Sequence, residues 1–362
     1  MRKLLVRLLK TLLILVVAIF VLTFLLSPQT TQPFLDHEGE VIKNSIAEMR
    51  SVDLNGVKQR ILIRGENRNN PILLHVHGGP GGAEQAIVRS SGKTVEDLFT
   101  VVYWDQRGAG ASYDSSLTLD SLSLEKIVND GISLVSYLRT EFGRDKIYLQ
   151  GHSWGTLVGT NMIAKSPNQF HAYFGIGHIA NSRRAELLSY NYTLDAAQKA
   201  GDQKTLNALK EFGAPPYKNE QEWIDNVMVE RALMQPYEIP GEEPYLSLVE
   251  IYSNFVFYKA YSVQDKLNSL EGSKRSLQAL WIEAVNADLF TSHPSLPIPV
   301  YFFQGKYDMH TVTEVARDYY EMVEAPHKEY FSFDKSAHWP HLEEHEKYRK
   351  LLKRILSEAP KQ

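Results

Sequence analysis

Hydrophobic and polar residues alternate in two neighbouring segments, residues 47–54 and 57–64. Alternation with a period of two is typical of strands that bury one face. The segments are joined by Asn55-Gly56, a dipeptide that favours a two-residue turn because both positions tolerate a positive φ. The pattern therefore predicts a β-hairpin.

Beyond this hairpin, short apolar runs alternate with segments of helical spacing. Six further strands are predicted, at residues 71–76, 99–104, 146–150, 172–179, 299–304 and 328–334. Helices are predicted at 123–142, from 151 to about 165, at 312–323 and at 343–356. Strands that mostly alternate with helices predict an α/β fold: an eight-stranded, mostly parallel sheet with helices on both faces.

The segment 181–294 breaks this alternation, because it is helical in pattern and contains no strand-like run. It falls between the sixth and seventh predicted strands, so we expect a helical cap over the carboxyl ends of the strands, where ligands bind. The predicted organisation is an N-terminal tail with a membrane anchor, a linker, a first core part, the cap and a second core part. Their ranges are 1–27, 28–42, 43–180, 181–294 and 295–362.

The N-terminus carries the most apolar stretch. Residues 11–26 are uncharged and almost wholly apolar. Extended back to residue 4, at ~1.5 Å per residue, the stretch would span a bilayer, with Arg7 and Lys10 reaching the headgroups. Because Arg2, Lys3 and these two cations precede it, we predict a single-pass helix in the cell membrane, a cytoplasmic N-terminus and an extracytoplasmic catalytic domain.

A cleaved signal peptide would show the same charged start and apolar middle. The run ends in Leu25-Leu26-Ser27-Pro28, which lacks a small-x-small cleavage site. An uncleaved anchor, with the lipid bilayer as partner, is therefore preferred. A cleaved segment and a buried helix remain the alternatives.

Composition narrows the class of protein. A chain of 362 residues suits one large α/β domain with an insertion, and 43% hydrophobic with 23% charged residues is ordinary for a globular protein. A net charge of −4 does not indicate nucleic-acid binding. The absence of cysteine excludes disulfides, thiolate catalysis and cysteine-bound metals. The composition leaves the oligomeric state open.

The segment Gly151-His152-Ser153-Trp154-Gly155 fits the pattern G-x-S-x-G. The bare pattern is weakly specific, but here it joins a predicted strand to a predicted helix. That context is typical of a nucleophile elbow, with Ser153 as the nucleophile. The alternative is a glycine-rich turn with an idle serine.

A serine nucleophile needs a histidine base and a carboxylate that orients it, in the chain order serine, acid, histidine. Asp308 follows the strand after the cap and is the predicted acid. Asp334, at the end of the last strand, is the alternative and is expected to cap a turn.

Five histidines follow Asp308: His310, His327, His338, His341 and His345. His310 is too close to Asp308 in the sequence, and His327 precedes the last strand. His345 lies inside the final helix. Pro340 favours a helix start, which leaves His338 on the loop above the sheet and places the alternative, His341, in the helix. His338 is therefore the predicted base.

The oxyanion of the reaction needs two backbone N–H donors. We predict Trp154, after the nucleophile, and Gly79, in the loop 77–82, where a side chain would block the approach. A plain flexible turn is the alternative for this loop.

Two histidine clusters resemble metal sites, but we interpret neither as one. His75-x-His77 has no acidic continuation, so His75 is expected in the core and His77 as a loop-shaping residue. His338-x-x-His341, with acidic residues after it, is explained by the serine assignment. We predict no metal and no cofactor.

Three segments carry a resemblance to a known family: residues 77–81 (HGGPG), 105–112 (DQRGAGAS) and 152–156 (HSWGT). On these, the chain resembles the proline iminopeptidase (prolyl aminopeptidase) branch of the α/β hydrolases, over roughly residues 45–180 and 295–345. The resemblance implies removal of an N-terminal proline or a similar residue from short peptides without metal or cofactor. Arg107 is expected to tie loops together beneath the site.

The family reads the free amine of its substrate with cap glutamates beside aromatic residues. Glu230, Glu250 and Glu283 are possible equivalents, and solvated helix carboxylates are the alternative interpretation. A transmembrane anchor is unusual for these peptidases.

The predicted function is a serine hydrolase that acts through an acyl-enzyme, as an aminopeptidase on short peptides. An esterase, amidase or lactonase on small extracellular acyl compounds is the first alternative. A non-catalytic surface protein that binds a small molecule is the second. Epoxide hydrolase and dehalogenase chemistry are disfavoured because both need an aspartate at the elbow.

Overall fold

The computed structural model describes residues 2–25, 27–239 and 253–359. One eight-stranded sheet forms its centre, in the order β1-β2-β4-β3-β5-β6-β7-β8. The strands are β1 (Ile46–Leu54), β2 (Val57–Gly65), β3 (Ile72–Val76), β4 (Thr100–Trp104), β5 (Ile147–His152), β6 (Phe170–Ile176), β7 (Val300–Gly305) and β8 (Lys328–Phe333). β2 pairs antiparallel with β1 and β4, and every other pairing is parallel. The predicted mostly parallel, eight-stranded sheet is confirmed.

The predicted hairpin forms β1 and β2, with Leu54 opposite Val57. Its turn places Asn55 at φ +52° and Gly56 at φ +79°. These are the left-handed values that an Asn-Gly turn adopts at low cost. The local sequence therefore decides this register.

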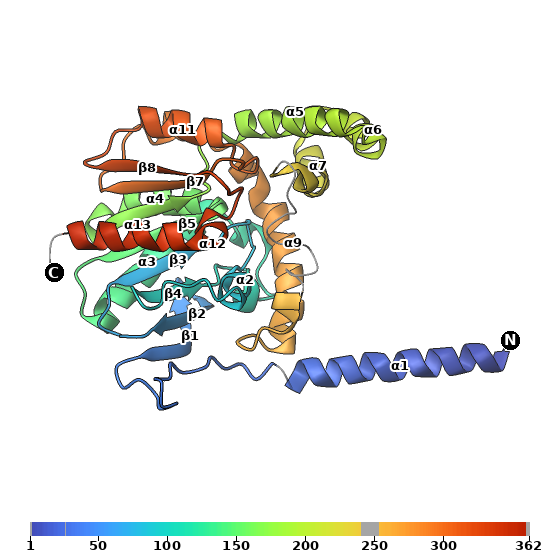
Figure 1. Cartoon of the computed structure of the whole chain (residues 1–362), viewed down its shortest axis with the longest axis horizontal. Coiled ribbons are helices and arrows are strands. Elements are labelled where there is room, and N and C mark those ends of the chain that lie inside the picture. Colours follow the sequence, from blue (N-terminus) through green and yellow to red (C-terminus); the bar gives the residue numbers. More distant parts are fainter. Residues whose placement is uncertain (1, 26, 240–252, 360–362) are drawn as a thin grey trace.

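Helices cover both faces of the sheet (Figure 1). They are α2 (Gln85–Ser90), α3 (Leu124–Phe142), α4 (Trp154–Lys165), α11 (Thr313–Met322), α12 (Pro340–Glu343) and α13 (His345–Glu358). Neighbouring strand residues belong to different cores. Leu74 is part of the cluster that includes residues of α3, α4 and α11, and Leu73 is part of the cluster that includes residues of α2 and α13. Because successive side chains of a strand point to opposite faces, continuous apolar runs are buried on both sides.

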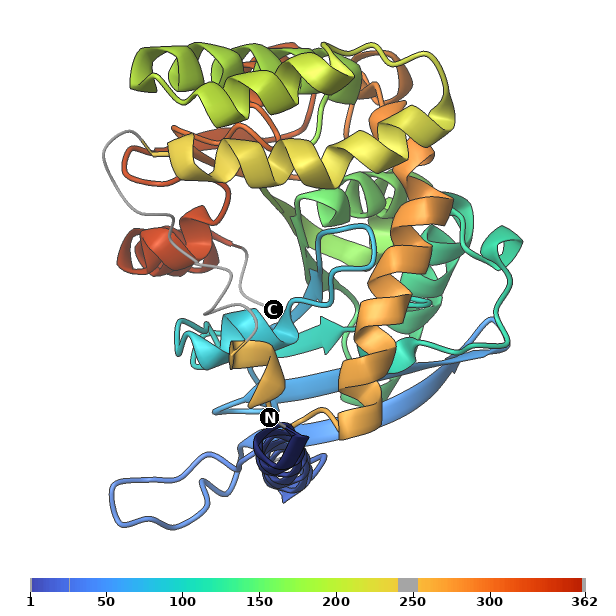
Figure 2. The same ribbon diagram turned by 90° about the vertical axis from the view of Figure 1, so that its right-hand side faces the viewer.

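The insertion between β6 and β7 is helical, as predicted. Its described helices are α5 (Ser182–Ala200), α6 (Gln203–Phe212), α7 (Glu220–Met234), α9 (Val263–Val285) and α10 (Leu289–Ser292). In Figure 1, α5, α6, α7 and α9 lie on the right-hand side of the sheet, and Figure 2 shows α9 running along one side of the domain. We call this insertion the cap.

The N-terminal segment forms one helix, α1 (Arg2–Leu25), which extends away from the domain in Figure 1. Its apolar side chains from Leu5 to Val21 that are described are exposed. Among the described residues, no helix combines the length and apolar character that crossing a membrane requires, so the predicted transmembrane anchor and its lipid partner are not supported. The predicted extracytoplasmic location stays a prediction.

Candidate functional site

Ser153 lies in a sharp turn between a strand and a helix. β5 ends at His152 and α4 begins at Trp154, with Ser153 between them at φ +52° and ψ −122°. A positive φ is unfavourable for serine, so the surrounding structure must hold the turn. The Ser153 N–H donates to the Ile176 carbonyl at 2.9 Å. This strained strand-to-helix turn is the geometry of a nucleophile elbow.

The glycines of the motif let the strand and the helix approach closely. A Cβ added at Gly151 would collide with the Gly155 carbonyl, and a Cβ added at Gly155 would collide with the Val76 carbonyl in β3. Any side chain at either position would therefore push α4 away from the sheet.

Asp308 and His338 form a buried pair, with 3.0 Å between Asp308 Oδ2 and His338 Nδ1. Asp308 follows β7, and His338 lies in the loop between β8 and α12. The carboxylate also accepts from the N–H groups of His310 and Thr311 at 2.9 Å, from the Thr311 hydroxyl at 2.7 Å and from the Gln304 amide at 2.9 Å. These donors hold the carboxylate in one orientation toward the imidazole.

Burial and hydrogen bonding set the charges of this pair. Burial raises the pKa of Asp308, but His338 and the N–H donors outweigh it and hold that pKa well below its usual value. Burial lowers the pKa of His338 to about 4, against the opposing effect of Asp308. The imidazole is therefore neutral near pH 7. A proton on Nδ1, donated to Asp308, leaves Nε2 with the lone pair that a general base needs.

The two alternative residues lie in other surroundings. His341 is in α12 and buried, and its ring nitrogens have no hydrogen-bond partner among the described residues. Asp334 is exposed and accepts a long bond of 3.4 Å from the Ser332 hydroxyl. Asp308, rather than Asp334, faces His338.

The loop after β3 lies against Ser153. A side chain at Gly79 would meet the N atoms of Gly82 and Gly81 at 2.5 and 2.6 Å, within the loop itself, and the expected block to the approach at Gly79 stays a prediction. Gly78 is the residue that faces the nucleophile, because a Cβ there would lie 3.1 Å from the Ser153 Cβ. Gly79, at φ +118°, shapes the turn.

Both predicted oxyanion donors are backbone groups near the nucleophile. Trp154 is the first residue of α4, and the first N–H groups of a helix have no acceptor within it. Gly79 lines the same cavity as Ser153. That these two groups hold an oxyanion stays a prediction.

A buried ion pair behind the elbow was not predicted. Glu84 Oε1 accepts the Gly78 N–H at 2.8 Å and lies 2.7 Å from His152 Nδ1. His152 Nε2 lies 2.9 Å from the His338 carbonyl oxygen. Since both ring nitrogens of His152 face acceptors, both donate and the ring is an imidazolium. The pair thus connects the Gly78 loop, the elbow and the loop of His338.

The charges of this pair agree with its geometry. Burial opposes charge on His152, but the charge and hydrogen bond of Glu84 outweigh it and raise the pKa of His152. Burial likewise opposes charge on Glu84, yet His152 and His75 hold its pKa well below the usual value.

The other histidines of this region lie as expected. His75 is buried, with Nε2 3.3 Å from Glu84 Oε2 and Nδ1 2.8 Å from the Gln150 amide. His77 is buried in the loop, with Nδ1 2.8 Å from the Gly78 carbonyl. Within the described parts of the chain, no group of three or more potential ligands is arranged to hold a metal ion.

His310 was set aside because it is close to Asp308 in sequence, but it contacts the predicted base. Its ring stacks on that of His338, with centroids 4.4 Å apart and 19° between the planes. His310 Nε2 lies 2.6 Å from Glu238 Oε1, a carboxylate of the cap. No local pattern signals these contacts, because the stacking joins the loops after β7 and β8 and the pair with Glu238 depends on the folded cap.

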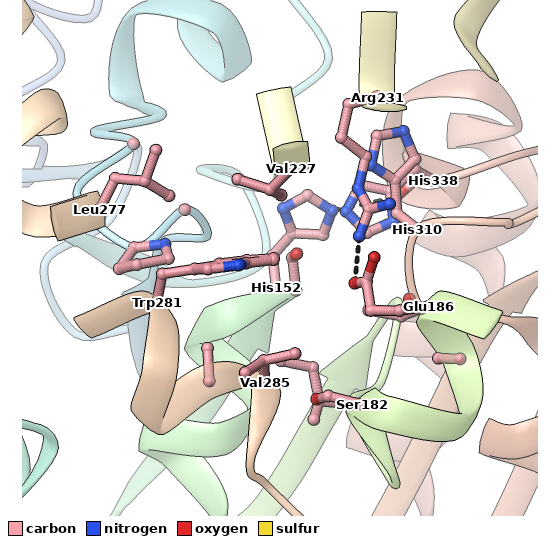
Figure 3. Close-up of a pocket in the computed structure, with 18 of the residues that line it drawn as sticks. His152, Ser182, Glu186, Val227, Arg231, Leu277, Trp281, Val285, His310 and His338 are labelled. Carbon is pink, nitrogen blue, oxygen red and sulfur yellow. Dashed lines mark hydrogen bonds and ion pairs between the residues drawn. The ribbon is translucent and has the colours of Figure 1, made fainter. Parts of the chain in front are cut away.

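A cavity of about 580 Å³ lies between the core and the cap, and Ser153, His152 and His338 line it. The cap contributes apolar side chains from α7 and α9, namely Val227, Leu277, Trp281 and Val285. Figure 3 shows Leu277 and Trp281 on one side of this cavity and Arg231, Glu186 and His310 on the other. The cavity therefore has an apolar side and a charged side.

The charged side is built from two cap helices. Arg231 of α7 forms an ion pair with Glu186 of α5, drawn as a dashed line in Figure 3. Glu230 is buried beside them, and burial together with the charge of Glu186 raises its pKa to about 8. Glu230 is therefore mostly neutral near pH 7, and Glu186 is the carboxylate that forms the ion pair with Arg231.

The predicted cap glutamates have different surroundings. Glu230 lies next to the charged side of the cavity. Glu283 instead accepts the Leu124 N–H at 3.2 Å, at the start of α3, and does not line the cavity. Glu250 lies outside the described residues. Glu186 was missed, because nothing in its local sequence marks it.

Arg107 has the predicted structural role. Its guanidinium binds both carboxylate oxygens of Asp130 in α3, at 2.7 and 2.9 Å. Asp130 also accepts from Gln59 of β2 and from Asn55 in the hairpin turn. These contacts tie the loop after β4 to α3 and the hairpin.

The α/β hydrolase fold family model matches residues 71–345. The probable aminopeptidase YbaC of Bacillus subtilis (strain 168) is 32% identical over 86% of this chain and 97% of that protein. A proline iminopeptidase of Saccharolobus solfataricus is 24% identical over 90% of this chain and 96% of its own length. The crystal structure of a proline iminopeptidase-related protein from Thermus thermophilus has a TM-score of 0.59, 16% identity and coverage of 87% of this chain and 98% of that chain.

The chain belongs to the α/β-hydrolase family, in its proline iminopeptidase-like branch. The resemblance inferred from the three sequence segments is confirmed. The family and the named relatives support a hydrolase, whereas the structural match, at 16% identity, shows the fold alone.

Proposed function

We propose that this protein is a serine hydrolase that acts through an acyl-enzyme and removes an N-terminal residue, proline or a similar one, from short peptides. The observation that carries the proposal is that Ser153, in its strained elbow, lines the same cavity as His338, which is paired with buried Asp308. The names of the relatives support a peptide bond as the target.

In the acylation step, the Ser153 hydroxyl attacks the carbonyl carbon of the scissile bond while His338 Nε2 takes its proton. Asp308 stabilises the resulting imidazolium. The N–H groups of Trp154 and Gly79 bind the oxyanion. When the C–N bond breaks, His338 returns the proton to the leaving amine.

In the deacylation step, water enters and His338 takes a proton from it. The hydroxide attacks the acyl carbon, and the ester bond to Ser153 breaks as the serine recovers its proton. The neutral state of His338 near pH 7 supports this role, because a base must be unprotonated when it acts.

The cavity supports an N-terminal residue as the acyl group. Such a residue brings an α-ammonium group, for which Glu186 supplies a carboxylate. The wall formed by Leu277 and Trp281 suits an apolar side chain or ring. The same wall would also suit the acyl group of a simple ester, so an esterase remains the second candidate.

Labelling with a fluorophosphonate tests the chemistry. The wild type should label, and Ser153→Ala should not. Equal labelling of both proteins would refute the assignment of the nucleophile.

Comparing kcat/KM on a prolyl arylamide and on a short acyl ester tests the substrate class, with Ser153→Ala as the blank. A preference for the prolyl amide is expected. A preference for the ester would keep the triad but move the protein to the esterases.

A further inference from the structure

The guanidinium of Arg231 is incompletely paired. Its Nη2 forms the ion pair with Glu186, whereas its Nη1 is buried without a hydrogen-bond partner among the described residues. The side chain is only 15% exposed and lines the cavity. A buried charged donor without a partner is destabilising, and a guanidinium is best satisfied by a planar anion that accepts two N–H groups. The free Nη1 therefore favours a carboxylate as ligand.

Among the described residues, the neighbours of Arg231 supply no second anion for its guanidinium. Glu186 is its one charged partner among the described residues of the cap, and buried Glu230 has a pKa raised to about 8 by burial and by Glu186. Asp308 faces His338, and the carboxylate of Glu238 faces His310. Neither Asp308 nor Glu238 forms an ion pair with Arg231 in the described structure.

A free dipeptide carries one charged group for each member of this ion pair. Its α-ammonium group matches Glu186, and its terminal carboxylate matches Arg231 Nη1. Two residues span ~7 Å, so both ends can reach one pair of oppositely charged side chains. A zwitterion also adds no net charge to the cavity, whereas an uncharged carboxyl end would leave Nη1 without a partner.

We propose that the preferred substrates are free dipeptides, whose α-amine is held by Glu186 and whose terminal carboxylate is held by Arg231. This inference rests on the proposed function, because it assigns the leaving residue of the same reaction. Arg231 and His338 line the same cavity, so a carboxylate held by Arg231 would belong to the residue whose amine receives the proton of His338.

The test compares kcat/KM for prolyl-alanine and for prolyl-alanine amide, with a prolyl arylamide as a third substrate. The wild type should prefer the free dipeptide to its amide by ~10- to 100-fold, the range expected for a hydrogen-bonded charge. Arg231→Gln should reduce this preference below ~3-fold, and Arg231→Lys should restore it in part. Arg184→Gln, which removes a half-exposed arginine of the same helix as Glu186, should keep the preference.

Binding gives a second measurement that does not depend on turnover. In the Ser153→Ala background, calorimetry should show ~10-fold tighter binding of prolyl-alanine than of its amide, and Arg231→Gln should remove the difference. Equal kcat/KM on both substrates in the wild type, or a preference that survives Arg231→Gln, would overturn the inference while the proposed function stands. No turnover of any prolyl substrate by the wild type would overturn both.

Discussion

The buried ion pair of Glu84 and His152 should fix the positions of the active-site loops relative to one another. The substitution Glu84→Gln tests this. The substitution keeps the size of the side chain and removes its charge. In the wild type, Glu84 Oε1 binds both the Gly78 N–H and His152 Nδ1, and His152 Nε2 binds the His338 carbonyl. A neutral His152 has one N–H, so it can no longer donate to both sides.

The magnitude follows from burial. Glu84 and His152 are 5% and 1% exposed, so solvent screens their interaction little. Removing one partner of a buried ion pair costs ~3–5 kcal/mol. Glutamine can keep the bond from Gly78, so we expect the free energy of unfolding to fall by ~2–3 kcal/mol. Loosening the Gly78 loop and the His338 carbonyl should also reduce kcat/KM by ~10- to 100-fold.

The loss of stability should depend on pH. The lowered pKa of Glu84 contributes stability that is present above its unfolded value of 4.5 and is lost as pH falls through the folded pKa. The raised pKa of His152 contributes stability that is present below its unfolded value of 6.5 and is lost as pH rises through the folded pKa. The difference between wild type and variant should therefore be largest between pH 4.5 and 6.5.

The assay is urea unfolding followed by tryptophan fluorescence at about pH 5.5 and about pH 9, with kcat/KM measured on a prolyl arylamide. Glu96→Gln is the matched control, because Glu96 is a buried carboxylate paired with Arg64 and Arg89, which keep their charge across this range. The control should lose about the same free energy of unfolding at pH 9 as at pH 5.5, whereas the loss for Glu84→Gln should be smaller at pH 9. A loss for Glu84→Gln that is below ~0.5 kcal/mol, or equal at both pH values, would refute the reasoning.

Three further predictions concern the nucleophile and its partners. Gly78→Ala should slow fluorophosphonate labelling by ~100-fold, because the new Cβ would meet Glu84 Oε1 at 2.6 Å and the Ser153 Cβ at 3.1 Å; labelling at the wild-type rate would contradict this packing. Asp308→Asn should lower kcat by ~10⁴-fold while circular dichroism shows a folded protein, because the amide no longer selects the productive tautomer of His338; a loss below ~10-fold would argue against Asp308 as the orienting acid. Since burial lowers the pKa of His338 to about 4 and the base must be neutral, kcat/KM should rise through pH 4 and be level from about pH 5 to 7; a rise centred near pH 6.5 would show that burial does not set this pKa.

The order of strands and helices could be predicted because its signals are local. The Asn55-Gly56 turn, the apolar runs and the glycines of the elbow each act within a few residues of their own position. Asp308 and His338 also followed from the sequence, since the order of elements places both loops at the same edge of a parallel sheet. The membrane anchor was predicted from an equally local signal, which the described helices do not support.

The remaining features depended on contacts between distant segments. Gly78 faces Ser153, Glu84 pairs with His152, and His310 stacks on His338 only because the elbow and three loops converge at one edge of the sheet. No residue pattern in any one loop reveals its partner in another.

The sequence by itself determined the strand and helix pattern, the elbow and the identity of the triad candidates. Only the tertiary structure decided which distant side chains meet around the cavity. Glu186 and Arg231 are ordinary helix residues in sequence, 45 positions apart. They become one buried ion pair on the cavity because α5 and α7 pack together, and burial strengthens the attraction between their charges by removing solvent screening.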